Sequence, residues 1–332
     1  MSALLEVRDL NIGVGKREIT DVVSGLSFSL ARGQRMGFVG ESGSGKTVTA
    51  LAIIRLLRPP LRIIGGSILL DGVDLMSLSE RQMNRVRGGR IAMIYQDPMS
   101  ALNPVLTIGA QISEAVRLHS DASRVLARAQ AIDLLGDVGV SRPSKRFDAY
   151  PHEFSGGMRQ RVMIAMAISA APEVLIADEP TTALDVTTQA RIMDLLDTIS
   201  ETRQIATMLI THDLAVASGF CDDITVMYAG RIVERAGVRS FYERPVHPYS
   251  EALLGAAIDM TIPVDRPITT IGGQPPHPGE LEGSCSFCPR CPYAEPICLE
   301  RRPELIAVTD AEVACHFAEA RALRQPETAV DG

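Results

Sequence analysis

The beginning of the chain alternates short apolar runs with polar turns. Apolar residues gather at residues 4–7, 22–30 and 35–39, and a further β-like patch lies at residues 66–72. Short apolar runs bounded by turn-forming residues are typical of strands joined by tight connections. The pattern therefore predicts an antiparallel β-region that leads into residues 40–47.

Three later apolar runs are continuous rather than alternating, and they cover residues 91–95, 174–177 and 206–211. Continuous runs of this length are typical of strands that are buried on both faces of a parallel sheet. In open α/β sheets, ligands bind at the carboxyl ends of such strands. Polar residues follow each run directly, and they are Gln96, the pair Asp178-Glu179, and His212.

Helical periodicity occupies most of the interval between the first two of these strands. Residues 108–118 and 123–138 repeat apolar positions at helical spacing, with arginines and acidic residues between them. We expect a helical subdomain inserted at about residues 97–158. After the third strand, residues 224–234 predict a hairpin that turns at Ala229-Gly230.

Residues 40–47 read Gly-Glu-Ser-Gly-Ser-Gly-Lys-Thr and fit the phosphate-loop pattern G-x-x-x-x-G-K-[ST] at every fixed position. An apolar strand, residues 36–39, precedes the loop, and an apolar helix is expected at residues 48–57. With strand, loop and helix in this order, the glycines let backbone N–H groups surround a polyphosphate at a helix N-terminus. A Gly-rich turn without this function would not require a strand before it and a helix after it. Lys46 is expected to pair with the β- and γ-phosphates and Thr47 to hold Mg²⁺. The expected contacts of the loop are Gly40, Ser42, Gly43, Ser44, Gly45, Lys46, Thr47 and Val48.

Two further features support a nucleotide site. Ser155 is a natural helix N-cap, and the following Gly156 and Gly157 expose backbone N–H groups at the start of a helix that is expected to run to residue 170. Alone, this feature is equally typical of a capped helix. Asp178 and Glu179 close a buried strand, where the first acid holds Mg²⁺ through water and the second faces the γ-phosphate.

Composition places the chain among ordinary globular proteins, with 332 residues, 46% apolar and 22% charged. The longest apolar stretch is broken by Pro172 and Glu173, and residues 1–10 lack a signal pattern, so a cytosolic, non-spanning chain is expected. The net charge is −7, and the chain carries 14 acidic residues against 7 arginines from Phe241 onward. This balance excludes the basic excess that nucleic-acid binding requires.

Five of the six cysteines lie between residues 285 and 315, while Cys221 is expected in the core. In a cytosolic chain, such crowding indicates metal ligation rather than disulfides. The intervals Cys285-x-x-Cys288 and Cys288-x-x-Cys291 both have the spacing of zinc ligands, so zinc remains one interpretation. The preceding segment, residues 271–279, is rich in Pro and Gly and is expected to lead the cysteine module over a partner's surface.

Together, the motifs between residues 40 and 212 resemble those of the nucleotide-binding subunit of an ABC transporter. Residues 95–104 and 150–161 are similar to the dipeptide/oligopeptide branch of bacterial importers, and residues 247–249 and 275–291 are similar to the C-terminal extension of that branch. The resemblance implies an α/β fold, with a P-loop NTPase (RecA-like) core, an antiparallel β-subdomain and a helical insertion. It also implies a nucleotide-binding domain at 1–240 and an extension at 241–332, with a cysteine metal-cluster module at about 271–318.

The resemblance also implies a mechanism in which two such subunits face each other head to tail and enclose ATP. Glu179 would polarise the attacking water, His212 would contact the γ-phosphate, and Lys46 would complete the catalytic set. Mg²⁺ would be placed by Thr47, Gln96 and Asp178. The other contacts to ATP would come from Ser155, Gly156, Gly157, Met158 and Asp185.

The implied function is ATP hydrolysis that drives import of di- or oligopeptides. Nickel, glutathione or a sugar oligomer are alternative substrates, and a non-transport ABC ATPase is a more distant alternative. The implied partners are a second ATPase subunit, which the branch favours as a paralogue, two membrane permease subunits and an extracytoplasmic peptide-binding protein, with no nucleic acid. The chain would then be peripheral to the cytoplasmic face of the cell membrane.

Two details of the resemblance need separate mention. The spacing of Cys285, Cys291, Cys298 and Cys315 resembles a [4Fe–4S] ligand set of the branch, with Cys288 as an additional thiol. The family stacks adenine on an aromatic residue near the position of Val14, but residues 1–27 contain no aromatic residue. Either an aliphatic contact replaces the stack, or binding depends more on the phosphates.

Overall fold

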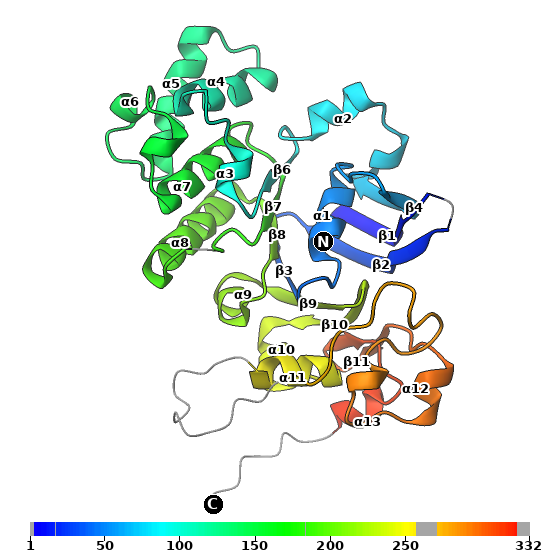
Figure 1. Cartoon of the computed structure of the whole chain (residues 1–332). Helices are drawn as coiled ribbons and strands as arrows, with labels where there is room; N and C mark the ends of the chain where they lie inside the picture. Colours follow the sequence, from blue (N-terminus) through cyan, green and yellow to red (C-terminus); the bar gives the residue numbers. More distant parts are fainter. Residues whose placement is uncertain (1–2, 17, 183, 257–270, 324–332) are drawn as a thin grey trace, which may run out of the picture. The chain divides into compact units, whose positions relative to one another are not determined.

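The computed structural model describes residues 3–16, 18–182, 184–256 and 271–323 (Figure 1). The chain divides into two compact units. Unit 1 consists of Met1–Glu6, Ser29–Arg35 and Ile68–Ile210, and unit 2 consists of Val7–Phe28, Met36–Ser67 and Thr211–Gly332. The division at residue 240 that the sequence predicts remains a prediction, and part of that extension, residues 257–270 and 324–332, lies outside the described residues.

The predicted N-terminal β-region is present, but the assignment of residues 35–39 to it is wrong, because Arg35–Val39 forms a strand of a different sheet and pairs parallel to Asp223–Tyr228. A four-stranded sheet has the order β2-β1-β4-β5, with β1 at Ala3–Val14, β2 at Thr20–Ala31, β4 at Leu61–Leu70 and β5 at Val73–Asp74. Buried and exposed residues alternate along β2 from Gly25 to Leu30, as expected of a strand with one face on the core. The pair β4–β5 is antiparallel.

The strands of unit 1 form the parallel arrangement β6-β7-β8 that the sequence predicts. They cover Ile91–Ile94, Val174–Asp178 and Ala206–Ile210. Every residue of β7 and β8 is buried, which explains their uninterrupted apolar sequences. In register, Ile94 lies opposite Ala177 and Asp178 lies opposite Ile210, so Gln96 and Glu179 follow the carboxyl ends of neighbouring strands.

The predicted helical insertion is present in unit 1. Helix α4 covers Ile108–Leu118, as predicted, and α5 covers Arg124–Asp137, with Ser123 as the N-cap whose side chain accepts a hydrogen bond from the N–H of Leu126. Helix α4 packs against α5 and α7 (Figure 1). The other helical elements of the unit are η1 (Leu75–Ser77), α2 (Glu80–Val86), α3 (Pro98–Ala101), α6 (Pro143–Arg146), η2 (Pro151–Glu153), α7 (Gly156–Ala167) and α8 (Val186–Arg203).

In unit 2, β3 (Arg35–Val39) runs parallel to β9 (Asp223–Tyr228), and β9 turns back into β10 (Arg231–Gly237). Ala229 and Gly230 both have positive φ, at 44° and 78°, which confirms the predicted hairpin turn. Two strands of the C-terminal region extend this sheet, because β12 (Ala311–Val313) pairs with β10 and β11 (Ile306–Val308) pairs with β12. The helical elements are α1 (Lys46–Ile53), α9 (Leu214–Phe220), α10 (Val238–Glu243), α11 (Pro248–Ala256), η3 (Cys288–Arg290), α12 (Pro296–Glu300) and α13 (Ala318–Ala322).

Two predicted helices end earlier in the structure than the sequence pattern indicates. Helix α1 ends at Ile53 rather than near residue 57, because Arg55 takes a left-handed conformation with φ of 53°. Helix α7 ends at Ala167, and Ala171, with φ of 50°, closes the turn that leads into β7. Cys221 is 8% exposed and caps the end of α9, so its predicted core position is confirmed. Among the described residues, no helix combines the length and the apolar character needed to cross a membrane.

Candidate nucleotide-binding site

The phosphate loop of unit 2 depends on two glycines with left-handed backbone geometry. Gly40 has φ of 148°, and a Cβ atom there would lie 2.2 Å from the carbonyl oxygen of Met227. Gly45 has φ of 100° and is the N-cap of α1. Only glycine takes both positions without strain, so the spacing of the motif follows from the shape of the loop.

Lys46 is 6% exposed and lies within the curve of the loop. Its ammonium group donates hydrogen bonds to the carbonyl oxygens of Gly40 at 2.7 Å and Glu41 at 2.9 Å, and to Ser44 Oγ at 3.1 Å. These contacts place the ammonium at the centre of the loop, while Ser42, Gly43 and Thr47 remain exposed. A buried cation encircled by backbone groups at a helix N-terminus is suited to receive an anion such as a polyphosphate.

Unit 1 holds the predicted residues at the ends of β6 and β7. Asp178 is 3% exposed at the end of β7. Glu179 has a left-handed backbone with φ of 45°, and its N–H donates to the carbonyl oxygen of Ile210 at 2.9 Å. Such a conformation costs on the order of 1 kcal/mol for a residue other than glycine, and it turns the carboxylate away from the strand.

The carboxylate of Glu179 has two side-chain donors in unit 1. Gln96 Nε2 donates to Glu179 Oε2 at 2.9 Å, and Thr182 Oγ1 donates to the same oxygen at 2.8 Å. The structure therefore brings together Gln96 and Glu179, which the sequence placed at the ends of different strands. Thr182 was missed by the sequence analysis, although it follows Glu179 by only three residues.

The predicted Ser-Gly-Gly element begins α7 as expected. Ser155 Oγ accepts from the N–H of Met158 at 3.4 Å, and a Cβ atom on Gly157 would lie 2.5 Å from Thr188 Cγ2. Asp185 caps α8 and accepts from the N–H of Thr188 at 2.9 Å. The hydrogen bond from the Thr188 side chain lowers the pKa of Asp185. The starts of α7 and α8 therefore meet at Thr188.

His212 follows the end of β8 and belongs to unit 2. It is exposed and lies between Thr211, which is buried, and Asp213, which caps α9. The phosphate loop and His212 belong to unit 2, while Gln96, Asp178, Glu179 and the Ser-Gly-Gly element belong to unit 1.

An ion pair that the sequence analysis missed fixes the phosphate loop to the C-terminal region. Arg290 donates to both carboxylate oxygens of Glu41, at 2.7 and 2.9 Å. The Arg290 side chain is 4% exposed and also donates to Tyr228 Oη at 3.2 Å and to the carbonyl oxygens of Ile271 and Gly272. The hydrogen bonds to Glu41 raise the pKa of Arg290. The two residues are 249 positions apart, and Glu41 occupies a variable position of the motif, so no local signal indicated the pair.

Aromatic residues surround this ion pair. Tyr249 Oη accepts from the N–H of Glu41 at 2.8 Å, and burial raises the pKa of Tyr249. The rings of Tyr228, Tyr249 and Phe287 lie within 5.4 Å of one another, centre to centre. The aromatic cluster helps to bury the guanidinium, whose side chain is 4% exposed, whereas the side chain of Glu41 remains 28% exposed.

The five C-terminal cysteines line one hollow of about 360 Å³. Burial raises the pKa of Cys285 to about 11 and raises the pKa values of Cys288, Cys291 and Cys315 as well. Within the described ranges, no three Cys, His, Asp or Glu side chains converge closely enough to hold a metal ion in this conformation. The thiols are gathered, but the predicted metal module is not demonstrated.

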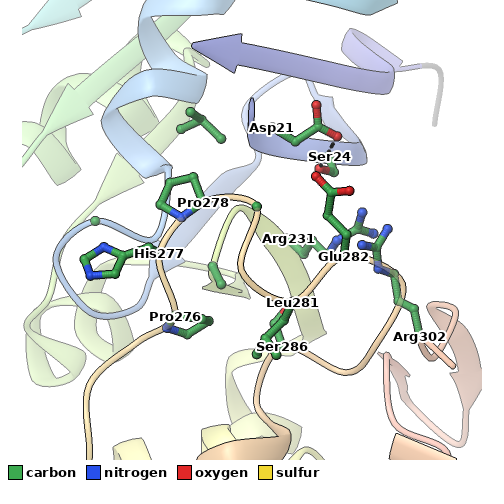
Figure 2. Close-up of a pocket in the computed structure, with 14 residues that line it drawn as sticks. Asp21, Ser24, Arg231, Pro276, His277, Pro278, Leu281, Glu282, Ser286 and Arg302 are labelled. Carbon is green, nitrogen blue, oxygen red and sulfur yellow. Dashed lines mark hydrogen bonds between the residues drawn. The ribbon is translucent and has the colours of Figure 1, made fainter. Parts of the chain in front are cut away.

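A second pocket, of about 550 Å³, adjoins the phosphate loop in unit 2 (Figure 2). Gly43 and Val22 form part of its lining, and the C-terminal residues Pro276, His277 and Pro278 form another part. Charged side chains of both signs also line it, and they are Asp21, Arg231, Glu282 and Arg302. The segment that was expected to cover a partner's surface therefore lies against this chain's own phosphate loop.

Comparisons with known proteins agree with the motifs. Residues 23–182 match the family described as ABC transporter, and residues 233–298 match the family described as oligopeptide/dipeptide transporter, C-terminal region. The chain is 47% identical over 313 residues to the "Probable peptide ABC transporter ATP-binding protein y4tR" of Sinorhizobium fredii, covering 94% of this chain and 93% of that protein.

Two relatives from Escherichia coli are similar over nearly their whole length. The oligopeptide transport ATP-binding protein OppD is 46% identical, covering 91% of this chain and 89% of OppD, and the dipeptide transport ATP-binding protein DppD is 43% identical, covering 95% and 97%. Among solved structures, the dimeric ATP-binding cassette MJ0796 bound to ADP and Pi matches with a TM-score of 0.63 over 71% of this chain and 99% of that one. At 24% identity this match shows the fold alone, which is that of an ATP-binding cassette.

Proposed function

The chain belongs to the family of ATP-binding proteins of peptide ABC transporters, and from this membership we propose that it hydrolyses ATP to drive the import of di- or oligopeptides. The observation that carries the ATPase assignment is the phosphate loop, in which a buried Lys46 is held inside a turn that only glycines at 40 and 45 permit. The peptide assignment rests on the relatives, which are named for peptide transport and match over 90% or more of this chain.

Each predicted site residue has a proposed role. Lys46 and backbone N–H groups of the loop bind the β- and γ-phosphates; hydrogen bonds to the carbonyl oxygens of Gly40 and Glu41 hold the Lys46 ammonium within the loop. Ser155, Gly156, Gly157 and Met158 offer the N-terminus of α7 to the nucleotide of a facing subunit. Asp185 holds the start of α8 beside them, and His212 contacts the γ-phosphate.

Glu179 is the proposed activator of the attacking water. Its carboxylate is held from one side by Gln96 and Thr182, so one oxygen is oriented while the backbone places the group beyond the end of the strand. A carboxylate in this position orients a water molecule for in-line attack and accepts its proton. Because Gln96 contacts Glu179 and precedes the helical insertion, it is suited to report the state of the site to those helices.

The oxygen donors Thr47, Gln96 and Asp178 fit Mg²⁺, which prefers hydroxyl, amide and carboxylate oxygens. Held by these residues, the cation would supply positive charge that offsets the negative charge developing on the phosphates. Asp178 is buried at the end of its strand, which is the position from which the first acid of such a pair holds Mg²⁺.

The proposed partners are a second ATPase subunit, which we take to be a paralogue, two membrane permease subunits and an extracytoplasmic peptide-binding protein. They would place this chain at the cytoplasmic face of the membrane. The relatives are ATP-binding components by name, so the transport path must be supplied by other chains.

We also propose that the cysteine hollow binds a [4Fe–4S] cluster through Cys285, Cys291, Cys298 and Cys315. What supports this is the donor chemistry, since five thiols line one hollow. The raised pKa values mean that binding must release protons from the thiols. Anaerobically purified protein should contain about four irons and four sulfides per chain, with a broad visible absorption band. One zinc and no colour would replace the cluster by the zinc alternative.

Uptake of labelled di- and tripeptides tests the transport assignment. Cells whose only copy of this chain carries Glu179→Gln should lose uptake, and cells with the exposed Glu201→Gln substitution in α8 should retain it. Unchanged uptake in the Glu179→Gln cells would contradict the proposed function.

A further inference from the structure

Glu41 of the phosphate loop is held by hydrogen bonds at three of its own groups, which are its N–H, its carbonyl oxygen and its carboxylate. Its N–H donates to Tyr249 Oη at 2.8 Å, its carbonyl oxygen accepts from Lys46 Nζ at 2.9 Å, and its carboxylate accepts two hydrogen bonds from Arg290. Lys46 is the residue that is proposed to bind the phosphates of ATP. A displacement of Glu41 would therefore move the carbonyl group that holds the Lys46 ammonium.

Glu41 also contributes a negative charge to the phosphate loop. Glu41 belongs to the loop that is proposed to bind a polyphosphate, and like charges at close range repel. Arg290 meets this carboxylate through two parallel hydrogen bonds, and the arginine side chain is only 4% exposed. The guanidinium thus neutralises the negative charge of Glu41 while it holds the loop.

Arg290 belongs to the cysteine-rich region and not to the loop. It ends the short turn η3, Cys288–Arg290, and Cys291 follows it directly. Its other hydrogen bonds, to the carbonyl oxygens of Ile271 and Gly272, attach the start of the same region. Pro276 and His277 further line a pocket with Gly43 of the loop, so the region meets the loop at a second place (Figure 2).

We propose that Arg290 is a positioning residue for ATP: from the cysteine-rich region it fixes the phosphate loop through Glu41 and neutralises the carboxylate beside the bound phosphates. This inference rests on the proposed function, because it requires that ATP binds at the loop. It makes the C-terminal region part of the nucleotide site of its own chain.

The test is a double-mutant cycle on the full chain, with a fluorescent ATP analogue as the probe of binding. The variants are Arg290→Gln, Arg290→Lys, Glu41→Gln and the double variant Arg290→Gln/Glu41→Gln. Glu251→Gln is the matched control, because Glu251 pairs at 2.5 Å with Arg321, a C-terminal arginine whose side chain is 7% exposed and which has no contact with the loop among those described. Thermal unfolding of each variant measures its stability separately.

Arg290→Gln should weaken ATP affinity about tenfold or more, since it leaves an unpaired carboxylate in the loop. The double variant should bind ATP more tightly than Arg290→Gln alone, because the uncompensated charge is gone. Arg290→Lys should restore part of the affinity, as it keeps the charge and loses the bidentate geometry. In hydrolysis, KM for ATP should rise while kcat at saturating ATP stays within about twofold. The control should lower the unfolding temperature without changing ATP affinity.

The inference is overturned if folded Arg290→Lys and Glu41→Gln both bind ATP as the wild type does, or if the two losses add in the double variant. If Arg290→Gln does not fold, Arg290→Lys and Glu41→Gln still test the inference. Failure of the wild type to bind the probe would instead remove the proposed function, and this inference with it.

Discussion

At the scale of single residues, neighbouring groups hold both Lys46 and Glu179: carbonyl oxygens of the loop accept hydrogen bonds from Lys46, and Gln96 and Thr182 donate to Glu179. Lys46 and Glu179 stand at positions that the phosphate loop and the strand end define. Thr182 and Arg290, which contact Glu179 and Glu41, carry no motif of their own. Arg290 lies 249 positions from Glu41, and tertiary packing, which local patterns do not encode, brings the two together.

The missing aromatic residue gives a prediction at this scale. Val14 ends β1 and is partly exposed, so a larger ring can be accommodated there. Val14→Tyr should tighten ATP binding about threefold to tenfold, since stacking of an aromatic ring on a base contributes about 1 kcal/mol or more. Titration with a fluorescent ATP analogue measures the change, and Val14→Leu serves as the aliphatic control. Equal affinities of the tyrosine and leucine variants would show that adenine does not reach this position.

At the scale of elements, the periodicity of apolar residues correctly predicted which segments form helices and which form strands. It predicted the ends of the helices less accurately. Helix α4 has the predicted bounds, because Thr107 caps its start and polar residues follow its end. Helix α1 stops four residues early, because a left-handed Arg55 interrupts a run that is otherwise mostly apolar. Hydrophobic pattern alone carries no information about such a residue. A charged cluster at the start of β7 was likewise missed, where Glu173 pairs with Arg90 and Arg32.

This cluster predicts a pH dependence. The hydrogen bond from Arg90 lowers the pKa of Glu173 below its ordinary value of 4.5. A carboxylate with a lowered pKa in the folded state stabilises the protein above its unfolded-state pKa, and the stabilisation is lost as the pH falls through the folded-state value. Glu173→Gln should therefore cost about 1–2 kcal/mol of unfolding free energy at pH 7.

Urea unfolding of the wild type and of Glu173→Gln, at pH 7 and at several values below 4.5, measures this difference. The gap between the two proteins should shrink as the pH falls, while Glu201→Gln should follow the wild type throughout. A gap that is constant with pH would show that Glu173 acts through packing and not through its charge.

At the scale of the whole molecule, the resemblance predicted the cassette fold, and the comparisons confirm it. It did not predict how the C-terminal region relates to the phosphate loop. Within unit 2, that region adds β12 and β11 beside β10 and supplies Arg290 to the loop. The spacing of the cysteines indicates a separate metal module. It does not indicate the structural role of the residues between the cysteines.

The central claim is that this chain is an ATPase whose chemistry depends on Glu179. The most direct measurement is ATP binding and Mg²⁺-dependent hydrolysis by the wild type and by Glu179→Gln, with Glu201→Gln as the control. The account predicts that Glu179→Gln binds ATP as tightly as the wild type and that its kcat falls by about 100-fold or more. Hydrolysis that is undiminished in Glu179→Gln would contradict the account.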